Sequence, residues 1–360
     1  MSLIRTNNRT LDGNQGRRNI LHNGSMRVAQ RGTSFDTLSS PSFCTDRWKI
    51  SFAGLDGNVD ADQTTTVPTG QGFANSLQIH MDASETSLDA ADQINVHQRL
   101  EGQDLQHLLK GTTGAKKTVL SFWVRSSVAS TYTLELYDND NTRSISKTYT
   151  IDTADTWEKK VVVFDGDTTG TLGNDNNRSM DVRWWIDAGS NFTSGTLDTS
   201  WASVTAANRV SQTTGWLEST SPEFYLTGCQ WEVGDTPTDF EHLSFSEELH
   251  ACKRYYEEYN NDNSYYFAQG AYTASTTSLY QMSWEVEKRA TPSVTLSAGS
   301  TFILTRPGSS NAAGGTMASG NRSRKNMYIQ SSSNPSSSTT GHGTSIATYT
   351  NSYVKIDAEL

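Results

Sequence analysis

The stretch PEFYLTGCQWEVGDTPTDFEHLSFSEELHACKRYYEEY, residues 222–259, decides how this chain is divided. Its first part, residues 224–233, reads as a strand, and Gly234 and Asp235 then mark a tight turn. An extended segment and one short helix follow. The stretch separates a long β-patterned region from a shorter region rich in Ser, Thr and Gly. We therefore expect it to be the junction between two domains.

The predicted helix has a clear start. Ser244 and Glu247 fit the S/T-x-x-E capping box, in which each side chain bonds the other residue's backbone N–H. A predicted oligomerisation stripe then lies along one face of the helix: Phe245, Leu249, Cys252, Tyr256 and Tyr259. This stripe needs a cover, which we expect to be a sheet or copies of the same helix.

The surrounding pattern predicts four segments. We expect an N-terminal docking segment (1–24), a jelly-roll-like domain (25–240), a linking helix (241–260) and a smaller C-terminal β domain (261–360). Residues 1–24 are too polar to fold alone, so they either dock onto their own domain, a sister subunit or another protein, or form a frayed terminus. The last segment has so few apolar residues that oligomerisation would have to supply part of its buried area.

Composition and periodicity predict a mostly β protein. Only 34% of the 360 residues are hydrophobic, but 9 Trp, 14 Tyr and 12 Phe can fill a sizeable core. Apolar and polar residues alternate over residues 75–81, 118–126, 131–137 and 180–187, with no helical pattern between them. Many short strands joined by polar turns indicate an antiparallel β-sandwich of jelly-roll size, followed by the linking helix and a second β domain.

Charge and hydropathy exclude several classes of function. The formal net charge is −10, and no dense basic stripe is present, which disfavours nucleic acid as a partner. There is no apolar run long enough to insert into a membrane and no signal-peptide pattern near Met1. We expect a protein that is not addressed to the secretory route.

Neither a metal site nor a catalytic site is predicted. Cys44, Cys229 and Cys252 are far apart and lack a CxxC motif, so we expect free buried thiols. Oxygen donors at alternate positions resemble the start of a calcium loop; they are Asp56, Asn58, Asp60 and Asp62. However, Ala61 and Val67 stand where such a loop needs Gly and Glu. A structural Ca²⁺ elsewhere is possible in such a fold, but we predict no cofactor.

No nucleophile, zinc-protease or phosphate-loop motif occurs in the chain. His80, His97 and His107 are interpreted as ordinary surface or packed histidines, and we predict no enzyme.

Aromatic residues on the polar faces of strands are candidates for sugar binding. A sugar ring can stack its C–H groups on an aromatic ring, while charged and amide groups bind its hydroxyls. The candidates are Trp123, Tyr137, Trp185 and Asp187 on strands and Trp201 and Trp216 in a long loop, residues 189–221. Alternatively, these rings are covered by that loop, by the N-terminal segment or by a neighbouring subunit.

Several segments resemble phage tail-fibre and tail-associated proteins that have a jelly-roll, carbohydrate-binding-module-like domain. They are NGSMRVAQRGTSF (23–35) with DRW (46–48), residues 224–233 with 240–241, residues 246–256, RATP (289–292) and DAEL (357–360). The long loop 189–221 and the Ser/Gly-rich C-terminal part depart from the family pattern.

The resemblance implies a virion structural protein, made in the host cytoplasm and placed in the phage tail. It further implies a homotrimer, contacts with other tail proteins through the N-terminal segment, and binding to host cell-surface polysaccharide. The alternative is a purely structural virion adaptor or decoration protein without receptor binding, and a glycan-cleaving spike is a third possibility.

Overall fold

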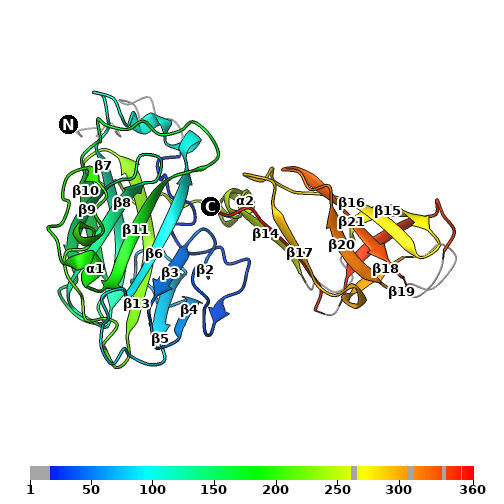
Figure 1. Ribbon diagram of the computed structural model, residues 1–360, viewed down its shortest axis with the longest axis horizontal. Coiled ribbons are helices and arrows are strands. Elements are labelled where there is room, and N and C mark those ends of the chain that lie inside the picture. The colour runs from blue at the N-terminus through cyan, green and yellow to red at the C-terminus, as the bar shows by residue number, and fades with distance from the viewer. Residues whose placement is uncertain (1–16, 261–265, 306–311, 335–337, 350) are drawn as a thin grey trace, which may run out of the picture. The chain divides into compact units, whose positions relative to one another are not determined.

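The computed structural model describes residues 17–260, 266–305, 312–334, 338–349 and 351–360. The chain forms two compact units, Met1–Phe245 and Ser246–Leu360 (Figure 1). The boundary falls inside the stretch that the sequence predicts as a junction, five residues after the predicted end of the first domain at residue 240.

The first unit is a sandwich of two antiparallel sheets. The first sheet has six strands: β1 (Ser34–Phe35), β4 (Val59–Thr64), β5 (Ser76–Met81), β13 (Glu223–Val233), β7 (Thr118–Ser126) and β10 (Glu158–Phe164). The second has seven: β12 (Ala202–Ser203), β9 (Arg143–Thr150), β8 (Thr131–Asp138), β11 (Arg178–Ala188), β6 (Gln93–Glu101), β3 (Lys49–Ala53) and β2 (Ser42–Phe43). Figure 1 shows β11, β6 and β3 side by side in one layer.

Short helical turns complete the unit. They are η2 (Gly102–Asp104), η3 (Gln106–Leu108), α1 (Ser190–Thr193) and η4 (Ala206–Asn208).

Large aromatic side chains fill the space between the two sheets. Trp184 of β11 packs against Trp48 and against Phe122 of β7, with ring centroids 5.4 and 5.5 Å apart. Trp231 of β13 and Tyr132 of β8 are also fully buried in this core. Because successive strand residues point to opposite faces, the inward positions predicted from alternation fill the core. The predicted mostly β, jelly-roll-like sandwich is confirmed.

The N-terminal segment docks on its own unit at a bulge in β13. The register of β13 shifts between Thr227 and Gln230, where Gly228 has a φ of +62° that favours glycine. Asn19 donates a side-chain hydrogen bond to the Cys229 carbonyl and accepts one from the Trp231 N–H, at 2.9 and 3.0 Å. Among the alternatives for the docking segment, residues 17–24 therefore bind their own domain, and residues 1–16 lie outside the described residues.

The second unit has two further antiparallel sheets. One has three strands: β14 (Tyr256–Asn260), β23 (Tyr353–Asp357) and β17 (Ser293–Leu296). The other has seven: β19 (Ala312–Ala313), β18 (Phe302–Leu304), β22 (Gly343–Thr348), β15 (Tyr266–Ala274), β16 (Thr277–Ser283), β21 (Asn326–Ser332) and β20 (Thr316–Gly320). A short η5 (Gly299–Thr301) precedes β18, and Tyr280, Phe302 and Ile346 are buried in the core of this unit.

The predicted linking helix is shorter than the sequence pattern suggests. Helix α2 covers Phe245–Lys253, and β14 follows. Tyr256 and Tyr259 therefore lie on a strand that pairs with β23, so the five-residue helical stripe Phe245, Leu249, Cys252, Tyr256 and Tyr259 is wrong. The reason is tertiary: β23, almost 100 residues later, offers β14 a backbone ladder. The spacing of apolar residues over a few helical turns carries no information about a partner strand so far along the chain.

Three further sequence expectations concern the cysteines, the acidic loop and membranes. Cys44, Cys229 and Cys252 are buried and none of the three forms a disulfide, as predicted. Residues 59–64 form β4 rather than a loop. No helix in the described part of the chain is long and apolar enough to cross a membrane.

Candidate functional site

A polar groove lies on the outer face of the second sheet. Its volume is about 250 Å³. It is lined by Ser51, Phe52, Gln93, Asn95, His97, Arg99, Arg183, Phe192 and Arg209. Four of these residues come from successive outward positions of β6, and the loop after β11 supplies the last two.

Strand alternation places these side chains. On β6, Ile94 and Val96 point into the core, so Asn95 and His97 face outward. The strand register then extends two rows of outward residues across the sheet. His97 lies between Lys49 of β3 and Arg183 of β11, and Asn95 lies between Ser51 and Trp185.

Two buried carboxylates anchor the arginines beside the groove. Glu135 of β8 accepts two hydrogen bonds from Arg209, at 2.7 and 2.8 Å, and one from the Trp185 Nε1–H at 3.0 Å. Asp181 of β11 accepts two hydrogen bonds from Arg178, at 2.7 and 2.6 Å. Such two-pronged pairs fix the plane of each guanidinium group.

Arg183 joins the two pairs. Its Nη2 donates to Asp181 at 3.0 Å, and its Nη1 lies 3.8 Å from Glu135. The guanidinium groups of Arg183 and Arg209 also lie over the ring of Trp185, 5.4 and 5.0 Å from its centroid. The result is one continuous buried network beneath the groove.

The charges and the burial of this network shift the pKa values of Asp181 and His97. Burial alone raises the pKa of Asp181, but the positive charge that His97 gains in acid and the charges of Arg183 and Arg178 outweigh it and lower that pKa to about 2. Burial, and then the charge of Arg183, holds the pKa of His97 well below its usual range. At neutral pH the groove therefore contains a neutral imidazole beside permanently charged guanidinium groups.

His97 carries an unsatisfied polar atom at the groove. Its Nδ1 lies 3.0 Å from Asn95 Oδ1, whereas its Nε2 is buried and has no hydrogen-bond partner among the described residues. Leaving a buried polar group unpaired costs about 1–3 kcal/mol. An imidazole nitrogen of this kind is ready to bond a ligand hydroxyl in the groove.

The predicted sugar-binding residues separate into different places. Tyr137 and Trp185 lie on the same outer face of neighbouring strands, but Trp123 is on β7 in the first sheet. Trp185 is fully buried under Phe192 and Val210, and Trp216 is fully buried in the core. Neither ring can stack on a sugar, so both predictions are wrong.

The loop of residues 189–221 also explains why Asp187 is buried. This carboxylate is buried and accepts hydrogen bonds from the Thr214 and Leu217 N–H groups at 2.8 and 3.0 Å. It holds the loop onto the sheet rather than facing solvent, which corrects its predicted binding role.

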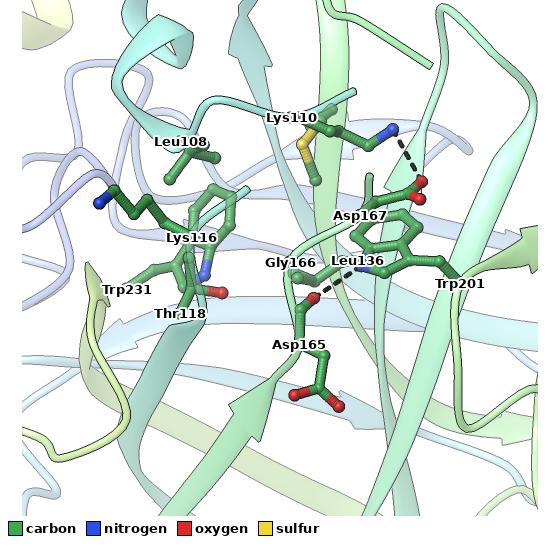
Figure 2. A pocket seen from close by; sticks show the side chains of 11 residues that line it. Leu108, Lys110, Lys116, Thr118, Leu136, Asp165, Gly166, Asp167, Trp201 and Trp231 are labelled. Atoms are coloured by element: carbon green, nitrogen blue, oxygen red, sulfur yellow. Dashed lines mark hydrogen bonds and ion pairs between the residues drawn. The ribbon is translucent and has the colours of Figure 1, made fainter. Parts of the chain in front are cut away.

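Trp201 lies beside a different and much smaller cavity (Figure 2). That cavity is only about 20 Å³, enough for about one water molecule. The Trp201 Nε1–H donates to the Asp165 carbonyl at 2.8 Å, and the Lys110 ammonium lies 5.0 Å from its ring. Lys110 is itself paired with Asp167 at 3.0 Å, so the ring covers a buried ion pair.

The binding-site residues predicted from the sequence did not include Asn95, His97, Arg99 and Arg209. A signal for the first three was present in QINVHQRLE, where polar residues alternate with Ile94 and Val96. No local signal marks Arg209, because only the folding of the long loop brings it to Glu135. Among the described residues, no group of three or more His, Cys, Asp or Glu side chains could hold a metal ion.

Comparison with known proteins gives only distant structural likeness. No protein-family model and no curated protein match the chain. The enzymatically active domain of tailspike protein 4 from bacteriophage CBA120 is 12% identical with a TM-score of 0.32, over 60% of this chain and 21% of that one.

Two carbohydrate-binding modules have similar values. A CBM4 structure is 12% identical with a TM-score of 0.32, over 59% of this chain and 98% of that one. The family 11 module of a cellulosomal cellulase of Clostridium thermocellum is 10% identical with a TM-score of 0.29, over 58% and 98%. These values assign the chain to no family.

Removing one buried carboxylate should destabilise the first unit strongly. We expect Glu135→Gln to lower the free energy of unfolding by about 3–5 kcal/mol, because Arg209 loses its charged partner while staying largely buried. The matched control is Asp155→Asn, whose carboxylate is 57% exposed and pairs with Arg125. That change should cost no more than about 1 kcal/mol in urea unfolding. Equal losses in the two variants would contradict the role of Glu135.

Burial of neutral His97 should make the protein sensitive to mild acid. The unfolded state protonates His97 below about pH 6.5 and the folded state does not, so stability falls as pH drops from 6.5 to 5. The slope from this one group is at most about 1.4 kcal/mol per pH unit. Urea unfolding at several pH values should show a shallower slope for His97→Gln. Parallel slopes would contradict the assigned neutral state.

Proposed function

We propose that the chain binds an oligosaccharide in the groove on the outer face of its second sheet. The observation that carries this proposal is the buried, unpaired Nε2 of His97 in a groove whose other polar lining groups are amides, a hydroxyl and guanidinium groups. Sugar hydroxyls both donate and accept, so they can satisfy an imidazole nitrogen and neighbouring amides together.

The groove also offers an apolar contact. Phe192 of α1 lines it and is only partly buried. Its ring can contact the C–H face of a sugar while the polar residues bind its hydroxyls. In this proposal, Phe192 takes the role that the sequence analysis gives to Trp185.

The proposal is binding without cleavage. Glycoside hydrolysis generally uses two carboxyl groups that flank the scissile bond. None of the described residues that line the groove is Asp or Glu, and Glu135 and Asp181 are buried under arginines. These features support a binding role.

We propose further that the binding serves host attachment by a phage tail fibre that assembles as a homotrimer and contacts other tail proteins. The support is the resemblance of residues 23–35, 224–233 and 246–256 to tail-fibre proteins. A purely structural adaptor or decoration protein is the alternative, and it predicts a groove that binds no sugar.

Binding should depend on the groove and not on the opposite sheet. After a glycan array identifies a ligand, calorimetry should show affinity losses of about five- to tenfold for His97→Ala and Phe192→Ala, about 1–1.4 kcal/mol each. The control is Lys159→Ala on β10 of the first sheet, which should bind like the unmodified chain. Loss of binding in Lys159→Ala alone, or no glycan bound at all, would contradict the proposal.

A further inference from the structure

The groove is cationic in a protein that is acidic overall. In the part of the chain that the structure describes, its lining residues include Arg99, Arg183 and Arg209 and no carboxylate. The whole chain carries a formal net charge of −10. A local concentration of positive charge against that average requires a specific explanation, because charge lining a concave site attracts ligands of the opposite sign.

The ion pairs of the described residues leave positive charge in excess here. Arg178, Arg183 and Arg209 all pair with Glu135 or Asp181, so three guanidinium groups share two carboxylates. Both carboxylates are fully buried, whereas the side chain of Arg99 is 23% exposed. The negative charges therefore lie beneath the arginines, and the excess positive charge faces the groove.

The arginines also keep donors for a ligand. Arg209 uses Nε and Nη2 for Glu135. The Nε–H of Arg183 is buried without a hydrogen-bond partner among the described residues. His97 Nε2, beside Arg183 in the strand register, also has no hydrogen-bond partner among the described residues. In the neutral ring the Nδ1–H faces Asn95 Oδ1, so Nε2 is an acceptor that suits a hydroxyl. Unused donors on guanidinium groups whose planes are already fixed suit an oxyanion, which they bind by short charge-assisted hydrogen bonds.

We infer that the ligand of this groove is an acidic oligosaccharide, with a carboxylate or sulfate group bound by Arg183 and Arg99 and a neighbouring hydroxyl bound by His97. This inference rests on the proposed sugar binding and names the class of sugar. Nucleic acid is the competing polyanion, but the net charge of −10 disfavours the many phosphate contacts that it needs.

The test compares four ligand classes by calorimetry on the full chain. They are oligogalacturonate for the carboxylate, a sulfated oligosaccharide for the sulfate, neutral oligosaccharides of the same length, and single-stranded RNA. We expect one acidic class to bind at least tenfold more tightly than its neutral counterpart. Raising the salt concentration should weaken that binding but not the neutral binding.

Arg99→Gln and Arg183→Gln should each lose at least tenfold in affinity for the acidic ligand and much less for the neutral one. The matched control is Arg125→Gln on β7 of the first sheet, whose side chain is 22% exposed against 23% for Arg99. It should bind normally. Arg183 bridges Glu135 and Asp181, so Arg183→Gln can fail to fold for that reason alone. In that case the affinity of Arg99→Gln for the acidic ligand decides whether the groove prefers acidic sugars.

The possible failures are distinguishable. Equal affinity for neutral and acidic sugars, unchanged in Arg99→Gln, would overturn the acidic preference and leave sugar binding in place. Binding of no sugar of either class would overturn the proposed function as well. Tighter binding of RNA than of any sugar would overturn both.

Discussion

The burial of two carboxylates, Glu135 and Asp181, is the constraint on which the groove depends. Neither side chain is exposed, and an ionised carboxylate in such a place is stable only when cations and hydrogen-bond donors surround it. Arg178, Arg183 and Arg209 meet that need. In doing so they hold their guanidinium groups in fixed planes along the outer face of the second sheet.

The same constraint ties the long loop after β11 to the sheet. Arg209 reaches Glu135 from that loop, and Asp187 bonds loop N–H groups further along. Phe192 at the start of the loop packs on Trp185, with ring centroids 5.4 Å apart. The loop thus acts as one wall of the groove, and it converts a flat sheet surface into a concave one.

Much of the fold is predictable from the sequence because it depends on local periodicity. Alternation over residues 118–126, 131–137 and 180–187 correctly separates inward from outward positions, which is enough to predict a β-sandwich. The shared outer face of Tyr137 and Trp185 also follows from alternation. Alternation does not predict which of the two sheets a strand joins. The strand of Trp123 shows the same alternation, yet this strand, β7, pairs with β10 and β13 in the other sheet.

The site was less predictable because long-range packing forms it. The loop that buries Trp185 and the pairing of β14 with β23 each join residues far apart in the chain. His97 shows the limit most clearly. Its strand position is readable in the sequence, but its burial and its unpaired nitrogen exist only once Arg183 and the loop are in place.

The most direct measurement of the central claim is a crystal structure of the full chain with a bound oligosaccharide. The account predicts a sugar hydroxyl within about 3 Å of His97 Nε2. It also predicts that the ligand lies along Asn95 and Arg183 on the outer face of the second sheet. A sugar bound instead on the outer face of the first sheet, with His97 Nε2 still unpaired, would contradict it.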